Sequence, residues 1–345
     1  MHLGRRGFVI MTSEHPLERN LALELVRVTE AAALRAARWM GRGDKEAADQ
    51  SAVDAMREAL RYVDMDGVVV IGEGEKDEAP MLYIGERVGT GRPPKVDVAV
   101  DPIDGTNLTA KGLPNAITVV AVAERGSMYY DPHIVYMHKI AVGPDARGAI
   151  DINASVKNNL LRIARFMDRN VEDLTVVVLD RPRHEELIGD IRAAGARIKL
   201  ISDGDVAGAV MAALPGDTGV DALMGIGGTP EAVLAACALK CLGGDMQCKL
   251  WPRSEEERRK AEEDGNKDLD RVLTLDDLVS SDDVFFAATG ITSGEFLRGV
   301  RYRGDYAQTY SIMMRSRSGT MRRFETHHHL GLKRALAMGA SYVPD

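Results

Sequence analysis

Apolar residues recur at helical spacing through the first sixty residues of the chain. Residues 17–40 repeat an apolar position every three or four residues and end in a Gly-Arg-Gly turn, which predicts a long helix. A second helix is expected over residues 45–63, with Asp44 as its N-cap. Short apolar runs separated by Gly- and Pro-bearing turns then predict strands over residues 68–71, 96–100 and 117–123.

Strand-like and helix-like segments alternate after about residue 155, which favours a partly parallel sheet. The expected strands are residues 174–179, 197–201 and 220–224, and the expected helices are residues 184–195, 205–214 and 232–242. Residues 254–267 are charged and predict a solvated helix and loop. Residues 310–315 and 320–325 flank a Ser-Arg-Ser-Gly turn and predict a hairpin.

Three regions follow from this change of pattern. We expect residues 1–16 to form a disordered extension, with Met11 as an alternative start. Residues 17–155 would form an N-terminal α+β domain. Residues 156–345 would form a C-terminal α/β domain whose tail can pack back on the first.

Composition narrows the class of protein. The chain has 345 residues, 45% hydrophobic and 28% charged, as in globular proteins. It lacks an apolar run of about 18 residues and the apolar core of a secretory signal, so no membrane partner is expected. The net charge of −8 and the lack of a basic stripe argue against nucleic acid.

The cysteines indicate a reducing compartment. Cys237, Cys241 and Cys248 are odd in number and clustered late, which argues against a disulfide framework and favours the cytoplasm. Cys237 and Cys241 lie one turn apart on an apolar helix, as core residues do. A zinc site would lack a fourth ligand at suitable spacing. The histidines at 327–329 fit a strand end or the surface.

The strongest chemical signal closes the third expected strand. Asp101 and Asp104 lie three residues apart, followed by Gly105 and Thr106. We expect the strand to stop at Asp101, because Pro102 cannot donate to the ladder. Two carboxylates beside free N–H groups suit a divalent cation that holds a phosphate. An ordinary acidic turn is the alternative.

Three further acids stand out by position. Asp49 heads an apolar stripe of the second helix, where a carboxylate must be paired, protonated or metal-bound unless it merely complements the helix dipole. Glu73 directly follows an apolar strand, with a solvated acidic turn as the alternative. Glu231 stands between a glycine-rich loop and an apolar helix, where it also suits the dipole. A dinucleotide loop there would lack its third glycine.

Two segments have the composition of ligand-binding loops. Arg181 and Arg183 flank Pro182 after a strand, and guanidinium groups match phosphate oxygens. Asp203 and Asp205, on either side of Gly204, could accept hydrogen bonds from sugar hydroxyls. Surface ion pairing is the alternative for both segments. Asp203 could also head an aspartyl-phosphate motif, but Ala207 stands where such a motif has Thr or Val.

Taken in order, these blocks resemble the class II fructose-1,6-bisphosphatases of the lithium-sensitive, metal-dependent sugar and inositol phosphatase superfamily. The resemblance runs from about residue 17 to residue 330. Its blocks are Gly41-Arg42-Gly43-Asp44-Lys45, Ala47-Ala48-Asp49, Ile71-Gly72-Glu73-Gly74-Glu75, Asp77-Glu78-Ala79-Pro80-Met81-Leu82, Asp101-Pro102-Ile103-Asp104-Gly105-Thr106, Arg181-Pro182-Arg183-His184, Asp203-Gly204-Asp205 and Gly225-Ile226-Gly227-Gly228.

The resemblance implies a layered α/β/α/β/α sandwich and hydrolysis of fructose 1,6-bisphosphate to fructose 6-phosphate in gluconeogenesis. It implies two or three Mg²⁺ or Mn²⁺ ions in the N-terminal domain, a sugar site in the C-terminal domain, and a homodimer or homotetramer. The implied metal ligands are Asp49, Glu73, Asp101, Asp104 and Glu231. The implied substrate contacts are Asp104, Gly105, Thr106, Tyr136, Arg181, Pro182, Arg183, Asp203, Gly204, Asp205 and Gly228.

Catalysis in this interpretation needs no covalent phosphoenzyme. Thr106, with Asp49 and Glu73, would orient or deprotonate the attacking water, and Lys45 and Asp77 would support them. Asp104 often appears as Glu in the class, which leaves the preferred metal open. Two alternatives remain: a dual fructose-1,6-/sedoheptulose-1,7-bisphosphatase, and a non-catalytic sugar-phosphate sensor.

Overall fold

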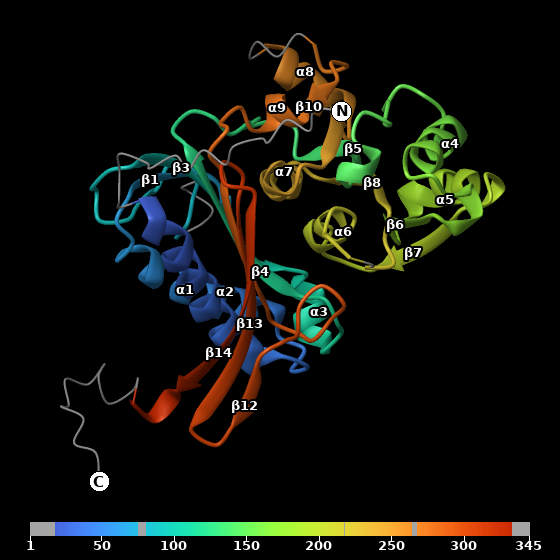
Figure 1. Cartoon of the computed structure of the whole chain (residues 1–345). Coiled ribbons are helices and arrows are strands. Elements are labelled where there is room, and N and C mark those ends of the chain that lie inside the picture. Colours follow the sequence, from blue (N-terminus) through green and yellow to red (C-terminus); the bar gives the residue numbers. More distant parts are fainter. Residues whose placement is uncertain (1–17, 75–80, 217, 264–267, 333–345) are drawn as a thin grey trace, which may run out of the picture.

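Two β-sheets alternate with three layers of helices through the molecule (Figure 1). The computed structural model describes residues 18–74, 81–216, 218–263 and 268–332. The eight-stranded sheet has the order β12-β13-β11-β4-β3-β1-β2, and β14 pairs with β13. Its strands are β1 (Asp66–Ile71), β2 (Arg87–Val88), β3 (Lys95–Asp104), β4 (Ile117–Glu124), β11 (Phe285–Gly290), β12 (Arg301–Arg303), β13 (Tyr306–Arg315) and β14 (Thr320–His329).

The six-stranded sheet has the order β10-β9-β5-β8-β6-β7. Its strands are β5 (Tyr136–Val142), β6 (Thr175–Leu179), β7 (Arg197–Ile201), β8 (Ala222–Gly228), β9 (Asp245–Leu250) and β10 (Leu273–Thr274). As the alternation of elements predicts, this sheet is partly parallel: β6 runs parallel to β7 and β8, whereas β5 is antiparallel to β8 and β9.

Three hydrophobic clusters hold the layers together. The first outer layer, α1 (Glu18–Ala36) and α2 (Lys45–Leu60), packs on one face of the eight-stranded sheet. The middle layer, α6 (Val206–Met211) and α7 (Thr229–Leu242), fills the space between the sheets. The second outer layer, α4 (Val156–Phe166) and α5 (Glu185–Ala193), covers the far face of the six-stranded sheet. The expected α/β/α/β/α sandwich is therefore confirmed.

Shorter helices complete the chain. They are α3 (Thr106–Lys111), α8 (Glu255–Glu263) and α9 (Leu275–Leu278). Helix α7 is apolar all round because both sheets cover it, and ten of its residues are buried. In the described part of the chain, no helix combines the length and the apolar character that crossing a membrane requires.

The expectation that β3 stops at Asp101 is wrong. The strand continues to Asp104, and Asp101 and Asp104 oppose Val119 and Ile117 of β4. Between these two pairs β3 advances by three residues and β4 by two, so β3 carries one extra residue, a β-bulge. The bulge accommodates Pro102, which has no N–H to donate, and the Ile103 N–H donates to Asp101 Oδ1 at 3.0 Å.

The chain passes between the sheets in both directions. β5 already belongs to the six-stranded sheet, and β11 to β14 return to the eight-stranded one. The predicted hairpin is confirmed and is longer than expected, running over Tyr306–Arg315 and Thr320–His329. The histidines at 327–329 end this hairpin. The domain boundary near residue 155 stays a prediction.

All three cysteines are buried and free. Burial raises the pKa of the Cys237 thiol to about 12, as expected for a core residue rather than a nucleophile.

Candidate active site

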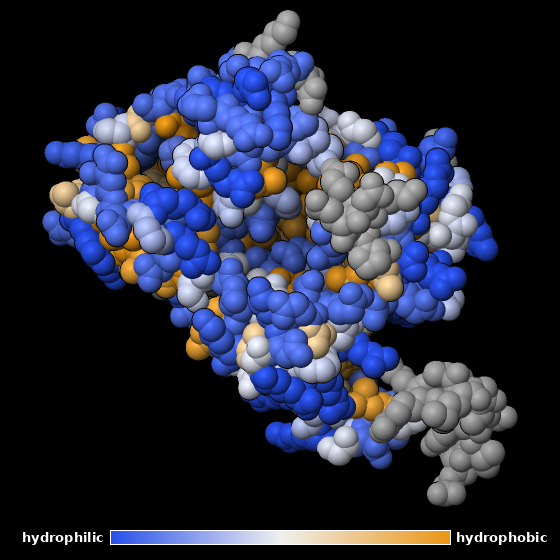
Figure 2. All heavy atoms as spheres, turned by 180° about the vertical axis from the view of Figure 1, so that it is seen from behind, coloured by the Kyte–Doolittle hydropathy of each residue, from blue (hydrophilic) through white to orange (hydrophobic). Residues whose placement is uncertain are grey.

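A cavity of about 590 Å³ lies where the two sheets meet. Glu73 follows β1, which runs parallel to β3, and Asp101 lies near the end of β3. From the other sheet, Arg181 and Asp203 follow the parallel strands β6 and β7. Carboxyl ends of parallel strands are the usual position of ligand sites in such folds. The face seen from behind is mainly hydrophilic and is hollowed near its centre (Figure 2).

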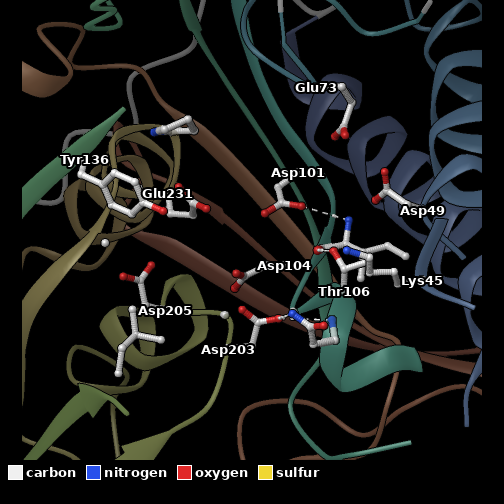
Figure 3. A pocket seen from close by; sticks show the side chains of 18 of the residues that line it. Lys45, Asp49, Glu73, Asp101, Asp104, Thr106, Tyr136, Asp203, Asp205 and Glu231 are labelled. Atoms are coloured by element: carbon white, nitrogen blue, oxygen red, sulfur yellow. Dashed lines mark hydrogen bonds between the residues drawn. The ribbon is translucent and has the colours of Figure 1, made fainter. Parts of the chain in front are cut away.

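Five predicted metal-ligating acids line this one cavity. They come from α2, the β1 turn, β3 and the start of α7, and are Asp49, Glu73, Asp101, Asp104 and Glu231. Figure 3 shows Glu73 and Asp49 on one side of Asp101 and Glu231 on the other. Residues nearly two hundred positions apart are therefore brought together, as a shared site requires.

Burial and mutual repulsion make these carboxyls hard to ionise together. Burial, followed by the charges of Asp49 and Glu231, raises the pKa of Glu73 to about 8. Burial and the neighbouring Asp104 raise the pKa of Asp101 well above its usual range. The pKa of Asp104 is raised in the same way by burial and Asp205. Such a cluster needs protons or cations to be stable.

The donor set fits divalent cations. Asp104 Oδ2 and Glu231 Oε2 are buried without a hydrogen-bond partner among the described residues. A buried carboxylate oxygen without a donor is costly, and a cation would satisfy it. Clustered carboxylate oxygens are the hard ligands that Mg²⁺ and Mn²⁺ take. The chemistry of these donors therefore suits such ions, although among the described residues no three His, Cys, Asp or Glu side chains are placed closely enough together to hold one ion.

Gly105 and Thr106 begin α3 beside these acids. Gly105 has φ of +95°, a conformation that favours glycine, and it lets the chain turn from β3 into the helix. The Thr106 hydroxyl donates to the Ile103 carbonyl at 3.2 Å, so its oxygen can accept a further hydrogen bond from the cavity. Lys45 lines the same side of the cavity, whereas Asp77 lies outside the described residues.

The Asp203-Gly204-Asp205 turn comes from the other sheet and approaches β3. Asp203 Oδ2 accepts hydrogen bonds from the Asn107 backbone and side chain at 3.2 and 3.1 Å. Gly204 has φ of +68°, and a Cβ there would lie 3.1 Å from Asp104 Oδ1. Glycine is therefore needed for both conformation and space.

The arginines border the cavity near Tyr136. Arg183 donates from Nε and Nη2 to the Ile226 carbonyl at 3.2 and 2.9 Å, and its guanidinium lies 5.2 Å from the Tyr136 ring centroid. Arg181 lies 3.6 Å from Asp203. Among the described residues, Pro182 is the one predicted site residue that does not line the cavity.

Three supporting residues were not predicted from the sequence: Asn107, which holds Asp203, and also His184 and Lys139. His184 joins the arginine loop to β8, because its Nε2 accepts from the Ile226 N–H at 2.7 Å and its Nδ1 lies 2.7 Å from the Leu179 carbonyl oxygen. Lys139 forms a buried ion pair with Asp205 at 2.7 Å. The signal in the sequence for Lys139 is a lysine inside the apolar run of β5, a strand that the hydrophobic pattern does not predict.

A protein family described as bacterial fructose-1,6-bisphosphatase, glpX-encoded, matches residues 19–328. The chain belongs to this family. It is accordingly a metal-dependent phosphatase that acts on fructose 1,6-bisphosphate, as the earlier resemblance indicated. The family-level prediction is thereby confirmed.

Individual relatives agree over nearly their whole length. A "Fructose-1,6-bisphosphatase class 2" from Haemophilus influenzae is 47% identical over 329 residues, covering 91% of this chain and 97% of the relative. A "D-fructose 1,6-bisphosphatase class 2/sedoheptulose 1,7-bisphosphatase" from Synechococcus is 47% identical over 336 residues, covering 90% and 96%. A solved structure named extragenic suppressor from Pyrococcus furiosus aligns with a TM-score of 0.28 and 13% identity over 56% of this chain and 69% of that one, too little to support an argument.

Proposed function

We propose that this cavity removes the 1-phosphate of fructose 1,6-bisphosphate with two or three Mg²⁺ or Mn²⁺ ions held by Asp49, Glu73, Asp101, Asp104 and Glu231. The observation that carries this assignment is that one oxygen each of Asp104 and Glu231 is buried and has no hydrogen-bond partner among the described residues. When bound, the cations neutralise phosphate charge, stabilise the leaving oxygen and make water a better nucleophile. The product, fructose 6-phosphate, fits a role in gluconeogenesis.

The reacting phosphate lies against Gly105 and Thr106 in this mechanism. Thr106 directs its hydroxyl hydrogen to the Ile103 carbonyl, so the hydroxyl oxygen accepts a hydrogen bond from the attacking water. The water oxygen forms a new bond to phosphorus, and the one proton that it loses passes to the carboxylate of Asp49 or Glu73. The bond between phosphorus and the C1 oxygen breaks, and that oxygen takes up a proton from solvent. Positioning and charge stabilisation account for most of phosphoryl-transfer catalysis.

The rest of the substrate extends toward the six-stranded sheet. Arg181 and Arg183 bind the distal 6-phosphate, because a guanidinium matches phosphate oxygens in pairs. Asp203 and Asp205 accept hydrogen bonds from sugar hydroxyls, and Gly228 lines the same part of the cavity, where a Cβ would collide with the Glu231 carboxylate. Tyr136, beside Arg183, closes this end of the cavity.

The test is phosphate release from fructose 1,6-bisphosphate in Mn²⁺ or Mg²⁺, with inositol 1-phosphate in parallel wells. We expect release from the fructose substrate alone. Release from inositol 1-phosphate alone would retain the metal chemistry and overturn the sugar assignment. Binding of fructose 1,6-bisphosphate without turnover would instead support a sugar-phosphate sensor.

A second substrate is suggested by the Synechococcus relatives, whose names include sedoheptulose 1,7-bisphosphatase. We propose that this chain also accepts sedoheptulose 1,7-bisphosphate, which is one carbon longer. Equal enzyme concentrations assayed on both substrates test this, and a kcat/KM ratio below about 10⁻⁴ for the longer sugar would contradict it, because that discrimination exceeds what one extra group usually provides.

We also propose a cytoplasmic homodimer or homotetramer. The free, buried thiols are compatible with a reducing compartment. Sedimentation velocity of the purified chain tests the oligomeric state, and a monomer at micromolar concentration would contradict it.

A further inference from the structure

Lys139 places a buried ammonium group beside Asp205 and near Glu231, two of the acids that line the cavity. It lies on β5, in the middle of the six-stranded sheet, and is 1% exposed. Its neighbours Met137 and Ala141 on the same face of the strand belong to the core beneath the cavity. The Nζ atom lies 2.7 Å from Asp205 Oδ2 and 3.4 Å from the Gly228 carbonyl oxygen.

A lysine in this position must be held by charges. Removing an ammonium from water costs several kcal/mol unless anions surround it. Burial lowers the pKa of Lys139, but the charges of Asp205 and Glu231 outweigh this effect and raise it overall. Lys139 in turn lowers the pKa of Glu231, against the larger opposing effects of burial and Asp205. The lysine therefore stays charged and acts on both carboxylates.

The backbone leaves room for this ion pair. A Cβ at Gly227 would lie 2.6 Å from Lys139 Cε and would also collide with Asp205 Oδ2. Because the lysine, the aspartate and the glycine come from β5, the turn after β7 and β8, three elements converge to enclose the pair. Such enclosure fixes the orientation of the Asp205 carboxylate.

We propose that the Lys139 ammonium acts as an internal cation. By pairing with Asp205 it prevents this carboxylate from binding a metal ion and leaves it available to the sugar, so that metal ions bind only to the five-acid cluster. The ammonium engages one oxygen of Asp205 and leaves the other for a sugar hydroxyl. Without it, Asp205 and Glu231 would together attract an additional divalent ion. Lys139 is thus a positioning residue, and this role rests on the proposed function of Asp205.

The experiment is Mn²⁺ binding by the substrate-free protein, measured from the free-Mn²⁺ electron paramagnetic resonance signal. We expect Lys139→Met to bind Mn²⁺ about tenfold or more tightly, because one unit charge near Glu231 has that order of effect in a partly buried site. The KM for fructose 1,6-bisphosphate should rise more than kcat falls. Lys240→Met is the matched control: Lys240 is also largely buried and paired with Asp276 at 2.7 Å, far from the cavity.

Two further variants keep the test decisive if Lys139→Met folds poorly. Asp205→Asn leaves the ammonium unpaired, so Mn²⁺ should bind about tenfold more weakly. The double variant Lys139→Met, Asp205→Asn removes both charges and should return Mn²⁺ affinity to within about threefold of wild type. Double-variant affinity as weak as that of Asp205→Asn alone would overturn the proposal, because Asp205 would then itself be a metal ligand.

The outcomes separate this proposal from the proposed function. Unchanged Mn²⁺ affinity in Lys139→Met, in a wild-type protein that hydrolyses fructose 1,6-bisphosphate, would overturn the role of Lys139 alone. Wild-type protein that binds Mn²⁺ without hydrolysing any sugar bisphosphate would overturn the proposed function instead.

Discussion

Asn107 donates twice to Asp203, once from its backbone N–H at 3.2 Å and once from its side-chain amide at 3.1 Å. Asn107 belongs to α3, next to Gly105 and Thr106, whereas Asp203 follows β7 of the other sheet. This contact joins the start of α3, where we propose that the reacting phosphate lies, to the Asp203–Asp205 turn, which we propose binds the sugar. The contact restrains the relative position of these two parts of the cavity.

Asp101→Asn should abolish turnover while the fold is kept. Asn retains the acceptor for the Ile103 N–H but removes a charge that burial and Asp104 disfavour. In chelator, we expect the free energy of unfolding to rise by about 1 kcal/mol. Denaturant melts and phosphate release measure the two effects. Wild-type turnover in this variant would contradict the metal-site assignment.

Asp97→Asn is the matched control on the same strand. Asp97 is 1% exposed, and its Oδ2 accepts from the Ser127 and Met128 N–H groups at 2.9 and 3.2 Å, away from the cavity. We expect a stability loss of about 1 to 3 kcal/mol with kcat retained. Loss of kcat in the folded control would show that activity is sensitive to any change in β3.

Gly204→Ala should reduce kcat/KM at least about tenfold. Its Cβ would press on the Asp104 carboxylate from 3.1 Å, and φ of +68° strains any other residue by about 1 kcal/mol. Gly126→Ala is the control, because φ there is +79° and a Cβ would meet nothing within 4 Å. Equal losses of activity in the two variants would mean that strain alone is responsible.

Stability of the cation-free protein should fall as pH rises. Burial, with Asp49 and Glu231, raises the pKa of Glu73 from 4.5 to about 8. A carboxyl with a raised folded-state pKa binds its proton more tightly when folded. Its stabilising contribution is complete below the unfolded-state pKa and is lost as pH rises through the folded-state pKa. In chelator, Tm should therefore decrease between about pH 5 and about pH 8.

Glu73→Gln should flatten this decrease, because it removes one of the titrating groups. Added Mn²⁺ competes with protons, so it should raise the Tm of wild type more at pH 8 than at pH 6. Thermal melts across this range test both statements. A Tm that increases with pH in chelator would contradict the repulsion assigned to the acid cluster.

Arg183→Gln should lower kcat/KM for fructose 1,6-bisphosphate more than kcat/KM for fructose 1-phosphate, which lacks the distal phosphate. We expect kcat/KM to fall about tenfold or more for the bisphosphate, equivalent to losing a charge-assisted hydrogen bond. Arg192→Gln on the exposed side of α5 serves as control. Equal losses on both substrates would place Arg183 at the reacting phosphate or in a structural role.

The sequence located the acids because each stands at a recognisable break in a hydrophobic pattern. Asp101 comes near the end of β3, Glu73 directly after β1, and Glu231 at the start of α7. Their convergence did not follow from the pattern itself and entered through the family resemblance. Strand ends on one edge of a sheet meet only once strand order is known, and strand order depends on long-range pairing.

Other features depend on tertiary contacts and could not be predicted from the hydrophobic pattern of the sequence. The hydrophobic pattern does not predict β5, because His138 and Lys139 interrupt its apolar run, and the charge of the lysine is tolerated there because Asp205 faces it. The pattern also ends β3 too early, because Pro102 breaks a regular ladder, whereas the bulge opposite β4 accommodates it. The role of Asn107 is not predictable from the pattern, because its partner lies in the other sheet.

In the proposed mechanism, the five-acid cavity hydrolyses fructose 1,6-bisphosphate with bound divalent cations. The decisive measurement is phosphate release by the purified chain with Mn²⁺ or Mg²⁺, after chelation and after metal is restored. We expect chelation to stop the release and restored metal to recover it. Release from fructose 1,6-bisphosphate that persists undiminished in excess chelator would contradict this mechanism.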